Sequence, residues 1–169
     1  MCHFDANEKW YRTARSRLRF ELAGLALAKK AGMSPEEYAG FLWAQGASRW
    51  FGKPHALVSE YILKETEAFE TLYPEVEFKL GKVEGDEARL TFTRGCLGGW
   101  GKERWRTAET LGLAKDEVCL YCREAFRIWA DQLGLEAGTE PQQDGGCILT
   151  VKLTKEDKSR IPAAENTLF

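Results

Sequence analysis

The sequence has no long apolar run, no leader-like start and little net charge. No window contains the roughly 18 consecutive apolar residues that a membrane helix needs. The first residues lack the positive charge and the apolar stretch of a signal peptide. The formal net charge is −2, so no positive field gathers polyanions around the molecule. We therefore predict a cytoplasmic protein with no membrane partner and no nucleic-acid partner.

Histidine and the common catalytic motifs are also scarce. His3 and His55 are the only histidines, which excludes a metal site built from several of them. His55 stands in the first turn of a predicted helix, and we expect a surface or packing role for it. There is no Gly-x-Ser-x-Gly elbow, P-loop or dinucleotide fingerprint. The sequence thus lacks the motifs of a serine hydrolase and of a nucleotide-binding loop.

Repeats, low-complexity tracts and Pro/Ser-rich linkers are absent as well. A chain of 169 residues, 44% of them hydrophobic, is long enough to bury a core without disulfides. We predict a single domain over residues 1–153, with a helical first half and a cysteine-bearing second half of sheet and helix. Residues 154–169 are mostly polar and are predicted to form a C-terminal tail.

What is present in the first half is a helical pattern. Apolar residues recur every three to four positions from about Glu8 to Lys30, with a glycine after them. Ser34-Pro35-Glu36-Glu37 has the signature of a capping box, so a second helix begins there. Lys53-Pro54 is predicted to open a third helix that Tyr73-Pro74 ends. Its apolar stripe consists of Leu57, Val58, Tyr61, Ile62, Phe69 and Leu72.

The period of the pattern changes to two in the second half. Residues 76–80 and 87–92 alternate between apolar and polar side chains, which predicts a hairpin with one buried face. A final hairpin is predicted between Leu135–Pro141 and Cys147–Leu153. Two helices stand between the hairpins, a short one over 102–111 and a longer one with Asp116 as its N-cap. The predicted fold is α+β, with helices on one face of an antiparallel sheet of about four strands.

Four of the five cysteines lie in this second half. Cys119 and Cys122 are three residues apart on a predicted helix and so share a face. Cys96 follows one predicted strand and Cys147 begins another. If these strands are antiparallel neighbours, both cysteines lie at one edge of the sheet and all four thiols converge. Three interpretations stay open: small buried hydrophobes, a zinc or iron–sulfur site made by all four, or reactive thiols that line a substrate pocket.

Charged residues beside the cysteines are the other candidates. A glycine-rich segment, 95–101, contains Trp100 and is preceded by Arg94, an arrangement able to hold a small anion or to serve as a plain loop. Arg123 and Glu124 follow Cys122 directly, and we expect a surface pair unless Glu124 borders a pocket. A run of arginines on the first helix is predicted to be a solvated face: Arg12, Arg15, Arg17 and Arg19.

The cysteine-bearing segments also resemble a known family. Thr93-Arg94-Gly95-Cys96, Cys119-Leu-Tyr-Cys122-Arg123-Glu124 and Gly145-Gly146-Cys147 occur in the order of the motifs of the L-2-amino-thiazoline-4-carboxylic acid hydrolase-like family. The similarity covers roughly residues 70 to 153, with an extra glycine before Cys96 and a glutamate where the family has aspartate. The layout is also similar to the 4-vinyl-reductase-type hydrocarbon-binding domains, whose α+β fold encloses a small-molecule pocket.

These observations lead to one main hypothesis and two alternatives. The main one is a small-molecule site lined by Cys96, Cys122 and Cys147, in which Arg94, Arg123 and Trp100 bind the ligand. The resemblance implies hydrolysis of a cyclic amidine or thiazoline carboxylate, with Cys122, Glu124 and Cys96 as catalytic candidates. The first alternative is a zinc or iron–sulfur module that uses Cys96, Cys119, Cys122 and Cys147. The second is a hydrocarbon or tetrapyrrole binder without catalysis.

Overall fold

The computed structural model describes residues 5–73, 76–81, 83, 85–93, 101–142 and 145–154, with the side chains of 101–104 left out. The first element is a long helix, α1 (Ala6–Lys30). Asp5 caps it by accepting a hydrogen bond from the Glu8 amide at 2.8 Å. Gly32, at a φ of 83°, ends it as the pattern predicts.

Three further helices follow α1. The predicted capping box starts α2 (Pro35–Trp43), where Ser34 and Glu37 exchange hydrogen bonds. A short helix that the pattern did not indicate, α3 (Ala47–Phe51), comes next. The third predicted helix begins later than Lys53-Pro54: α4 runs over Val58–Leu72. The reason is that Glu60 accepts the Leu57 amide hydrogen bond at 2.9 Å, while Lys53 pairs with Glu60 instead of entering a helix.

The sheet has four antiparallel strands in the order β1-β2-β4-β3. Their bounds are β1 (Phe78–Leu80), β2 (Glu87–Phe92), β3 (Leu135–Pro141) and β4 (Cys147–Leu153). β1 is shorter than predicted because the Val76 amide donates to the Tyr73 carbonyl after α4. The register places Ala88, Leu90 and Phe92 opposite Val151, Leu149 and Cys147. All six are buried, which confirms the prediction that one face of the sheet is covered.

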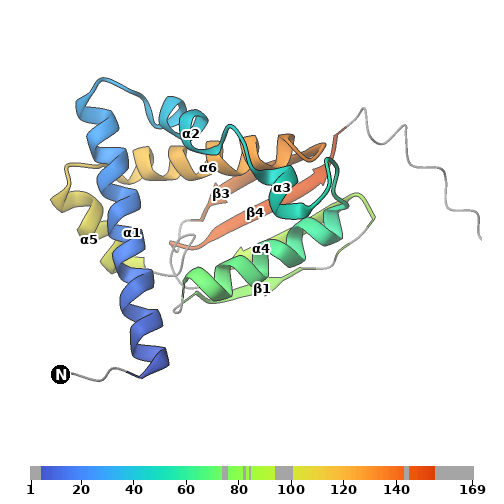
Figure 1. The fold of residues 1–169 in the computed structure, drawn as a ribbon, viewed down its shortest axis with the longest axis horizontal. Coiled ribbons are helices and arrows are strands. Elements are labelled where there is room, and N and C mark those ends of the chain that lie inside the picture. Colours follow the sequence, from blue (N-terminus) through green and yellow to red (C-terminus); the bar gives the residue numbers. More distant parts are fainter. Residues whose placement is uncertain are drawn as a thin grey trace, which may run out of the picture.

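Two helices connect the two halves of the sheet: α5 (Gly101–Thr110) and α6 (Lys115–Asp131). The N-cap of α6 is Ala114 and not Asp116, because the Glu117 carboxylate accepts the Ala114 amide hydrogen bond at 2.7 Å. Figure 1 shows α4 and α6 running alongside the strands, with α1 across one end of both helices. The α+β fold predicted from the sequence is therefore confirmed.

The core has two parts that meet at α6. One part packs α4 and the sheet-facing side of α6 onto β2 and β4. The other packs α1, α2 and α5 around the opposite side of α6, including Val118 and Tyr121. Tyr73 and Cys122 contact both parts. α6 thus separates a sheet core from a helical core.

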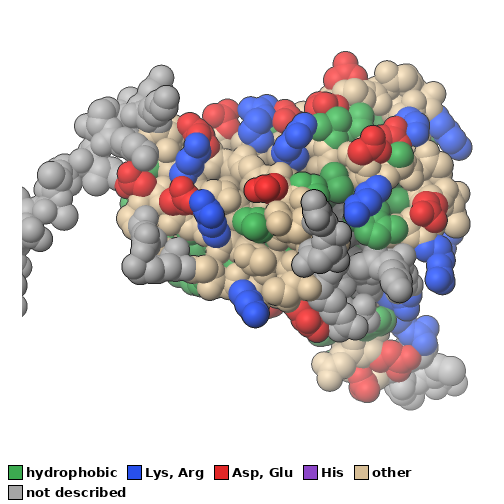
Figure 2. Space-filling view, turned by 180° about the vertical axis from the view of Figure 1, so that it is seen from behind, with side chains coloured by type: hydrophobic (Ala, Val, Ile, Leu, Met, Phe, Trp, Pro, Cys, Tyr) green, Lys and Arg blue, Asp and Glu red, His purple; other side chains and the backbone are tan. Residues whose placement is uncertain are grey.

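The described part of the chain has a surface of mixed charge and no membrane-spanning helix. Lysine and arginine are interspersed with aspartate and glutamate on the face in Figure 2, in keeping with the small net charge. No helix among the described residues is long and apolar enough to cross a bilayer. The glycine-rich residues 94–100 and the tail residues 155–169 lie outside the described residues.

Candidate functional site

Three of the four predicted cysteines lie at one end of the sheet. Cys119 and Cys122 are on α6, both half-buried, and Cys147 begins β4 and is buried. Because β2 and β4 are antiparallel neighbours, Cys147 stands opposite Phe92, the last residue of β2. The two strands are thus antiparallel neighbours, which was the condition for the cysteines to lie at one edge of the sheet. Cys96 itself lies outside the described residues, so the fourth member of the predicted cluster is not placed.

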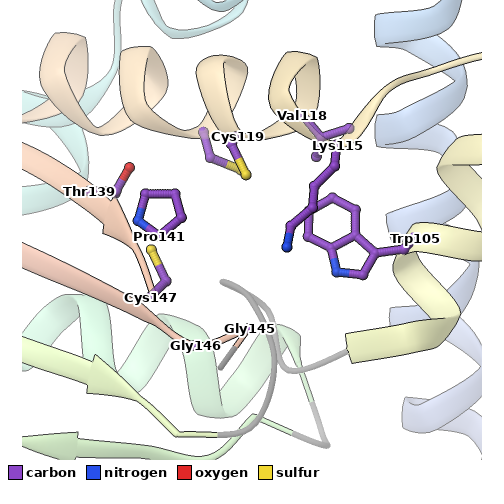
Figure 3. A pocket seen from close by; sticks show the side chains of 10 residues that line it. Trp105, Lys115, Val118, Cys119, Thr139, Pro141, Gly145, Gly146 and Cys147 are labelled. Atoms are coloured by element: carbon purple, nitrogen blue, oxygen red, sulfur yellow. The ribbon is translucent and has the colours of Figure 1, made fainter. Parts of the chain in front are cut away.

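These three cysteines line one small pocket, which we call the thiol pocket. Figure 3 shows the Cys119 and Cys147 side chains entering it from α6 and β4, with Trp105 and Lys115 across from them. Its volume is about 20 Å³. A single water needs roughly 10–15 Å³ on this measure. The pocket as described therefore has room for a water or an ion, and not for an organic molecule.

A metal centre in the thiol pocket stays a prediction. Within the part of the chain that the structure describes, no three His, Cys, Asp or Glu side chains are grouped closely enough to hold a metal ion. A site made by all four thiols would also need Cys96, which is not described.

The charged candidates near Cys122 do not enter the thiol pocket. Arg123 is exposed and lines an open depression beside Cys119. Glu124 binds Arg127, which donates to both carboxylate oxygens at 2.9 and 2.5 Å. These hydrogen bonds lower the pKa of Glu124, so it is a weak base. The other ligand-binding candidates, Arg94 and Trp100, lie outside the described residues.

A much larger cavity lies on the other side of Cys122. It is partly open, is lined by residues of α1, α2, α3, α4 and α6, and has a volume of about 300 Å³. Its walls are mainly aromatic, and we call it the aromatic cavity. Trp50 lines it and is 58% exposed, which places this ring where the cavity meets solvent. The remaining aromatic lining residues are Trp43, Phe69, Tyr73, Tyr121, Phe126 and Trp129.

Local contacts hold these rings in place. The Trp43 ring meets Trp129 edge to face at 5.4 Å, and its indole N–H donates to the Tyr121 hydroxyl at 3.1 Å. Gln132, just after α6, donates to the Trp43 carbonyl at 2.7 Å and accepts from the Ala47 amide at 3.3 Å. The end of α2 and the start of α3 are thereby attached to α6. The walls are built by the packing of separate helices.

Helix α1 closes the cavity and is fastened near both ends. The Trp10 indole N–H donates to the Thr71 carbonyl at the end of α4 at 2.5 Å. Lys29 pairs with Glu117 at the start of α6 at 2.8 Å. Between these contacts, Arg17 and Glu21 are the described residues of α1 that line the cavity.

Arg17 corrects the prediction of a solvated arginine face. Arg12, Arg15 and Arg19 are exposed as predicted, but Arg17 is half-buried and lines the aromatic cavity. Its guanidinium carbon lies 5.4 Å from the centre of the Tyr73 ring. The difference arises because residue 17 precedes buried Leu18 and follows buried Ala14 by one turn, so it stands at the border of the buried stripe.

Polar atoms of the cavity region lack hydrogen-bond partners. Two buried side-chain atoms of its described lining residues have none, Arg17 Nη1 and Glu21 Oε2. Such atoms are unusual in folded proteins and destabilise them unless something else binds there. Glu65, one turn after Tyr61 on α4, lines the same cavity. Burial raises the pKa of Glu65 to about 7, against the opposing effect of nearby Tyr61.

Sequence reasoning missed this cavity, although one signal for it was present. The apolar stripe of the third predicted helix passes from Ile62 to Phe69, and Glu65 occupies the position between them that should be apolar. On α1, Arg17 and Glu21 flank the apolar positions in the same way. A charged residue within a buried stripe, on each of two helices, was the available clue.

Comparisons with known proteins found no relative of this chain. No protein-family model, no curated protein and no solved structure matches it. The resemblance to the L-2-amino-thiazoline-4-carboxylic acid hydrolase-like family accordingly stays a prediction that rests on the quoted cysteine motifs.

Proposed function

We propose that this protein binds a small, largely apolar molecule in the aromatic cavity. The observation that carries the proposal is a cavity of about 300 Å³ with aromatic walls and buried polar atoms that have no described partner. Small-molecule pockets usually measure ~300–1,000 Å³ and combine apolar walls with a few polar groups. The thiol pocket, at about 20 Å³, is too small for the same task.

The size of the cavity narrows the ligand. At the lower end of the usual range, it suits a molecule with one or two rings better than a four-ring tetrapyrrole. A flat ring of the ligand would bind well by stacking on, or meeting edge to face, the rings of Trp43, Trp129 and Phe126. This keeps the ligand-binding part of the sequence hypothesis and moves the site from the thiol pocket to the space that α6 shares with α1 and α4.

A cysteine still borders the proposed site. Cys122 lines both the thiol pocket and the aromatic cavity. The hydrolase hypothesis would have this thiol act on the bound molecule. Glu124 is a poor partner for that chemistry, because its carboxylate is engaged by Arg127. Binding is therefore proposed here, and turnover and a metal centre remain predictions from the cysteine motifs.

Filling the cavity tests the proposal. Ala68 lines the cavity from α4, so Ala68→Phe places a ring in the ligand's space, and we expect at least a roughly tenfold loss of affinity for phenethyl alcohol. Quenching of the fluorescence of the three lining tryptophans, Trp43, Trp50 and Trp129, measures the binding. Ala6→Phe, at an exposed position of α1, is the control and should bind as the wild type does.

A second filling variant separates lost binding from lost folding. Ala125→Leu fills the cavity from α6 with a smaller change of volume. Circular dichroism and thermal unfolding identify a variant that folds normally. Unchanged affinity in a well-folded Ala68→Phe or Ala125→Leu protein, or no binding of any aromatic probe to the wild type, would refute the proposed function.

A further inference from the structure

The aromatic cavity contains an unusual set of charged groups. Arg17 and Glu21 enter it from α1 and Glu65 enters it from α4. The buried atoms Arg17 Nη1 and Glu21 Oε2 find no hydrogen-bond partner among the described residues. Arg17 is attracted by the Glu21 carboxyl and hydrogen-bonds Tyr73, so these two atoms are the unsatisfied parts of groups that otherwise have partners. A buried polar atom without a hydrogen bond destabilises the fold unless a ligand binds it. The charged groups of the cavity therefore indicate the charge of the ligand that it binds.

The sign of that charge follows from a count. Two carboxyl groups and one guanidinium line the cavity, and no other Lys, Arg, Asp or Glu of the described residues does so. The guanidinium of Arg17 already faces the Tyr73 ring at 5.4 Å. The described lining therefore has one acidic group more than it has basic groups, an excess of one negative charge. A single positive charge on the ligand would neutralise it.

The aromatic walls favour the same sign. The faces of tryptophan, tyrosine and phenylalanine rings carry negative potential, and they attract ammonium groups within about 6 Å. Trp43, Trp129 and Tyr121 come from two helices and are held in fixed relation by their mutual contacts. A ring cluster that includes carboxyl groups is the usual chemistry for recognising an organic amine. A carboxylate ligand would meet two carboxyl groups and only one guanidinium, that of Arg17, which already interacts with Glu21 and Tyr73.

We infer that the ligand is an organic cation, an aromatic or alicyclic amine, whose ammonium group lies between Glu21 and Glu65 and against the aromatic rings. This inference rests on the proposed function, because it names the chemistry of the molecule that the cavity binds. Glu65 is the group that responds to the ligand. Burial raises its pKa to about 7, and a nearby ammonium group lowers it. Binding therefore releases a proton near neutral pH.

Two tyrosine hydroxyls near the same space stay neutral in this range. Burial, together with the Glu21 carboxyl, raises the pKa of Tyr121, so the phenol stays neutral. Burial likewise raises the pKa of Tyr61. The groups around Glu65 are Arg17 and Glu21 from α1, Tyr61 and Tyr73 from α4 and its end, and Tyr121 and Cys122 from α6.

Three matched probes test the sign of the charge. Phenethylamine, phenethyl alcohol and hydrocinnamate share a phenyl ring and an ethyl chain, and end in a cation, a neutral hydroxyl and an anion. By tryptophan fluorescence at about pH 8, where Glu65 is ionised, we expect phenethylamine to bind roughly tenfold or more tightly than the alcohol. Hydrocinnamate should bind weakest. Equal binding of all three, or tightest binding of hydrocinnamate, overturns the inference while leaving the proposed function standing.

The Glu65 variant and its control locate the effect. In Glu65→Gln the preference for phenethylamine over phenethyl alcohol should fall by about tenfold, with the affinity for the alcohol nearly unchanged. Glu67→Gln, at an exposed position on the same helix, should keep the preference. In the wild type, phenethylamine affinity should fall below pH 7, and calorimetry in buffers of different ionisation enthalpy should detect the released proton. A preference that persists in Glu65→Gln contradicts the role given to Glu65.

Discussion

The two pockets that Cys122 borders differ in size and in the charged groups that line them. The thiol pocket holds about 20 Å³, and its one charged lining residue among those described, Lys115, lies over the Trp105 ring at 5.2 Å. The aromatic cavity holds about 300 Å³ and contains Glu21 and Arg17 atoms without described partners. The motif-bearing residues therefore lie where the protein is closely packed. The binding volume lies where the sequence shows no motif.

The difference has a physical origin in α6. Its side chains at three- and four-residue spacing divide between the sheet core and the helical core. Cys119 turns toward the thiol pocket, Phe126 and Trp129 turn toward the aromatic cavity, and Cys122 reaches both. Large rings from several helices leave irregular space between them, whereas the small thiols and the strands pack closely. The cysteine motif thus identifies one residue that lines the proposed site, Cys122, but does not indicate where the cavity lies.

The largest contrast should appear in the pH dependence of stability. Glu65 has a folded pKa of about 7 against 4.5 for an ordinary glutamate, so ionisation of Glu65 destabilises the fold by up to roughly 3 kcal/mol. Below pH 4.5 the group is protonated in both states, and stability falls as pH rises toward 7. We expect Glu65→Gln to equal the wild type near pH 4.5 and to exceed it by roughly 2–3 kcal/mol at about pH 8.

Urea unfolding at several pH values measures this difference. Glu67→Gln, exposed on the same helix, should follow the wild type throughout. A Glu65→Gln curve parallel to that of the wild type would show that the carboxyl is not held in an unfavourable environment. The raised pKa of Glu65, on which the inferred response to an ammonium ligand depends, would then be wrong.

A smaller effect should distinguish the thiols that border the two pockets. Cys122 lines both, whereas Cys119 lines the thiol pocket and the open depression. With phenethylamine bound in the aromatic cavity, we expect iodoacetamide to alkylate Cys122 several-fold more slowly and Cys119 at an unchanged rate. Peptide mass spectrometry over time measures both rates in one sample, so Cys119 is the internal control. Equal protection of both cysteines would place the probe in the thiol pocket.

The smallest effect should come from the candidate base. Glu124→Gln removes the ion pair with Arg127, and partly exposed pairs of this kind contribute about 0.3–0.5 kcal/mol. Glu8→Gln, which breaks the exposed pair with Arg12, serves as a comparison of similar size. Binding of phenethylamine should not change in either variant. A loss of probe affinity in Glu124→Gln alone would connect the thiol side of α6 to the cavity.

Much of the fold could be predicted because its signals are local. The capping box at Ser34 and Glu37, the alternation in β2 and the pairing of β3 with β4 all appear as predicted. The predicted helix boundaries were wrong where a side-chain contact outside the local pattern sets them. Glu117 caps α6 and also pairs with Lys29 of α1, and this second partner is invisible to a local pattern. The short helix α3 was not predicted for a related reason, since the amide of its first residue, Ala47, donates a hydrogen bond to distant Gln132.

By itself the sequence determined the helices other than α3, the strands, the covered face of the sheet and the proximity of Cys119 and Cys122, because spacing along the chain sets each of them. Only the tertiary structure decided that Arg17, Glu21 and Glu65 share one cavity, since they come from two helices whose crossing depends on packing. The charge of a buried group follows from its surroundings. A glutamate with a pKa of about 7 therefore cannot be recognised until the helices that bury it are in place.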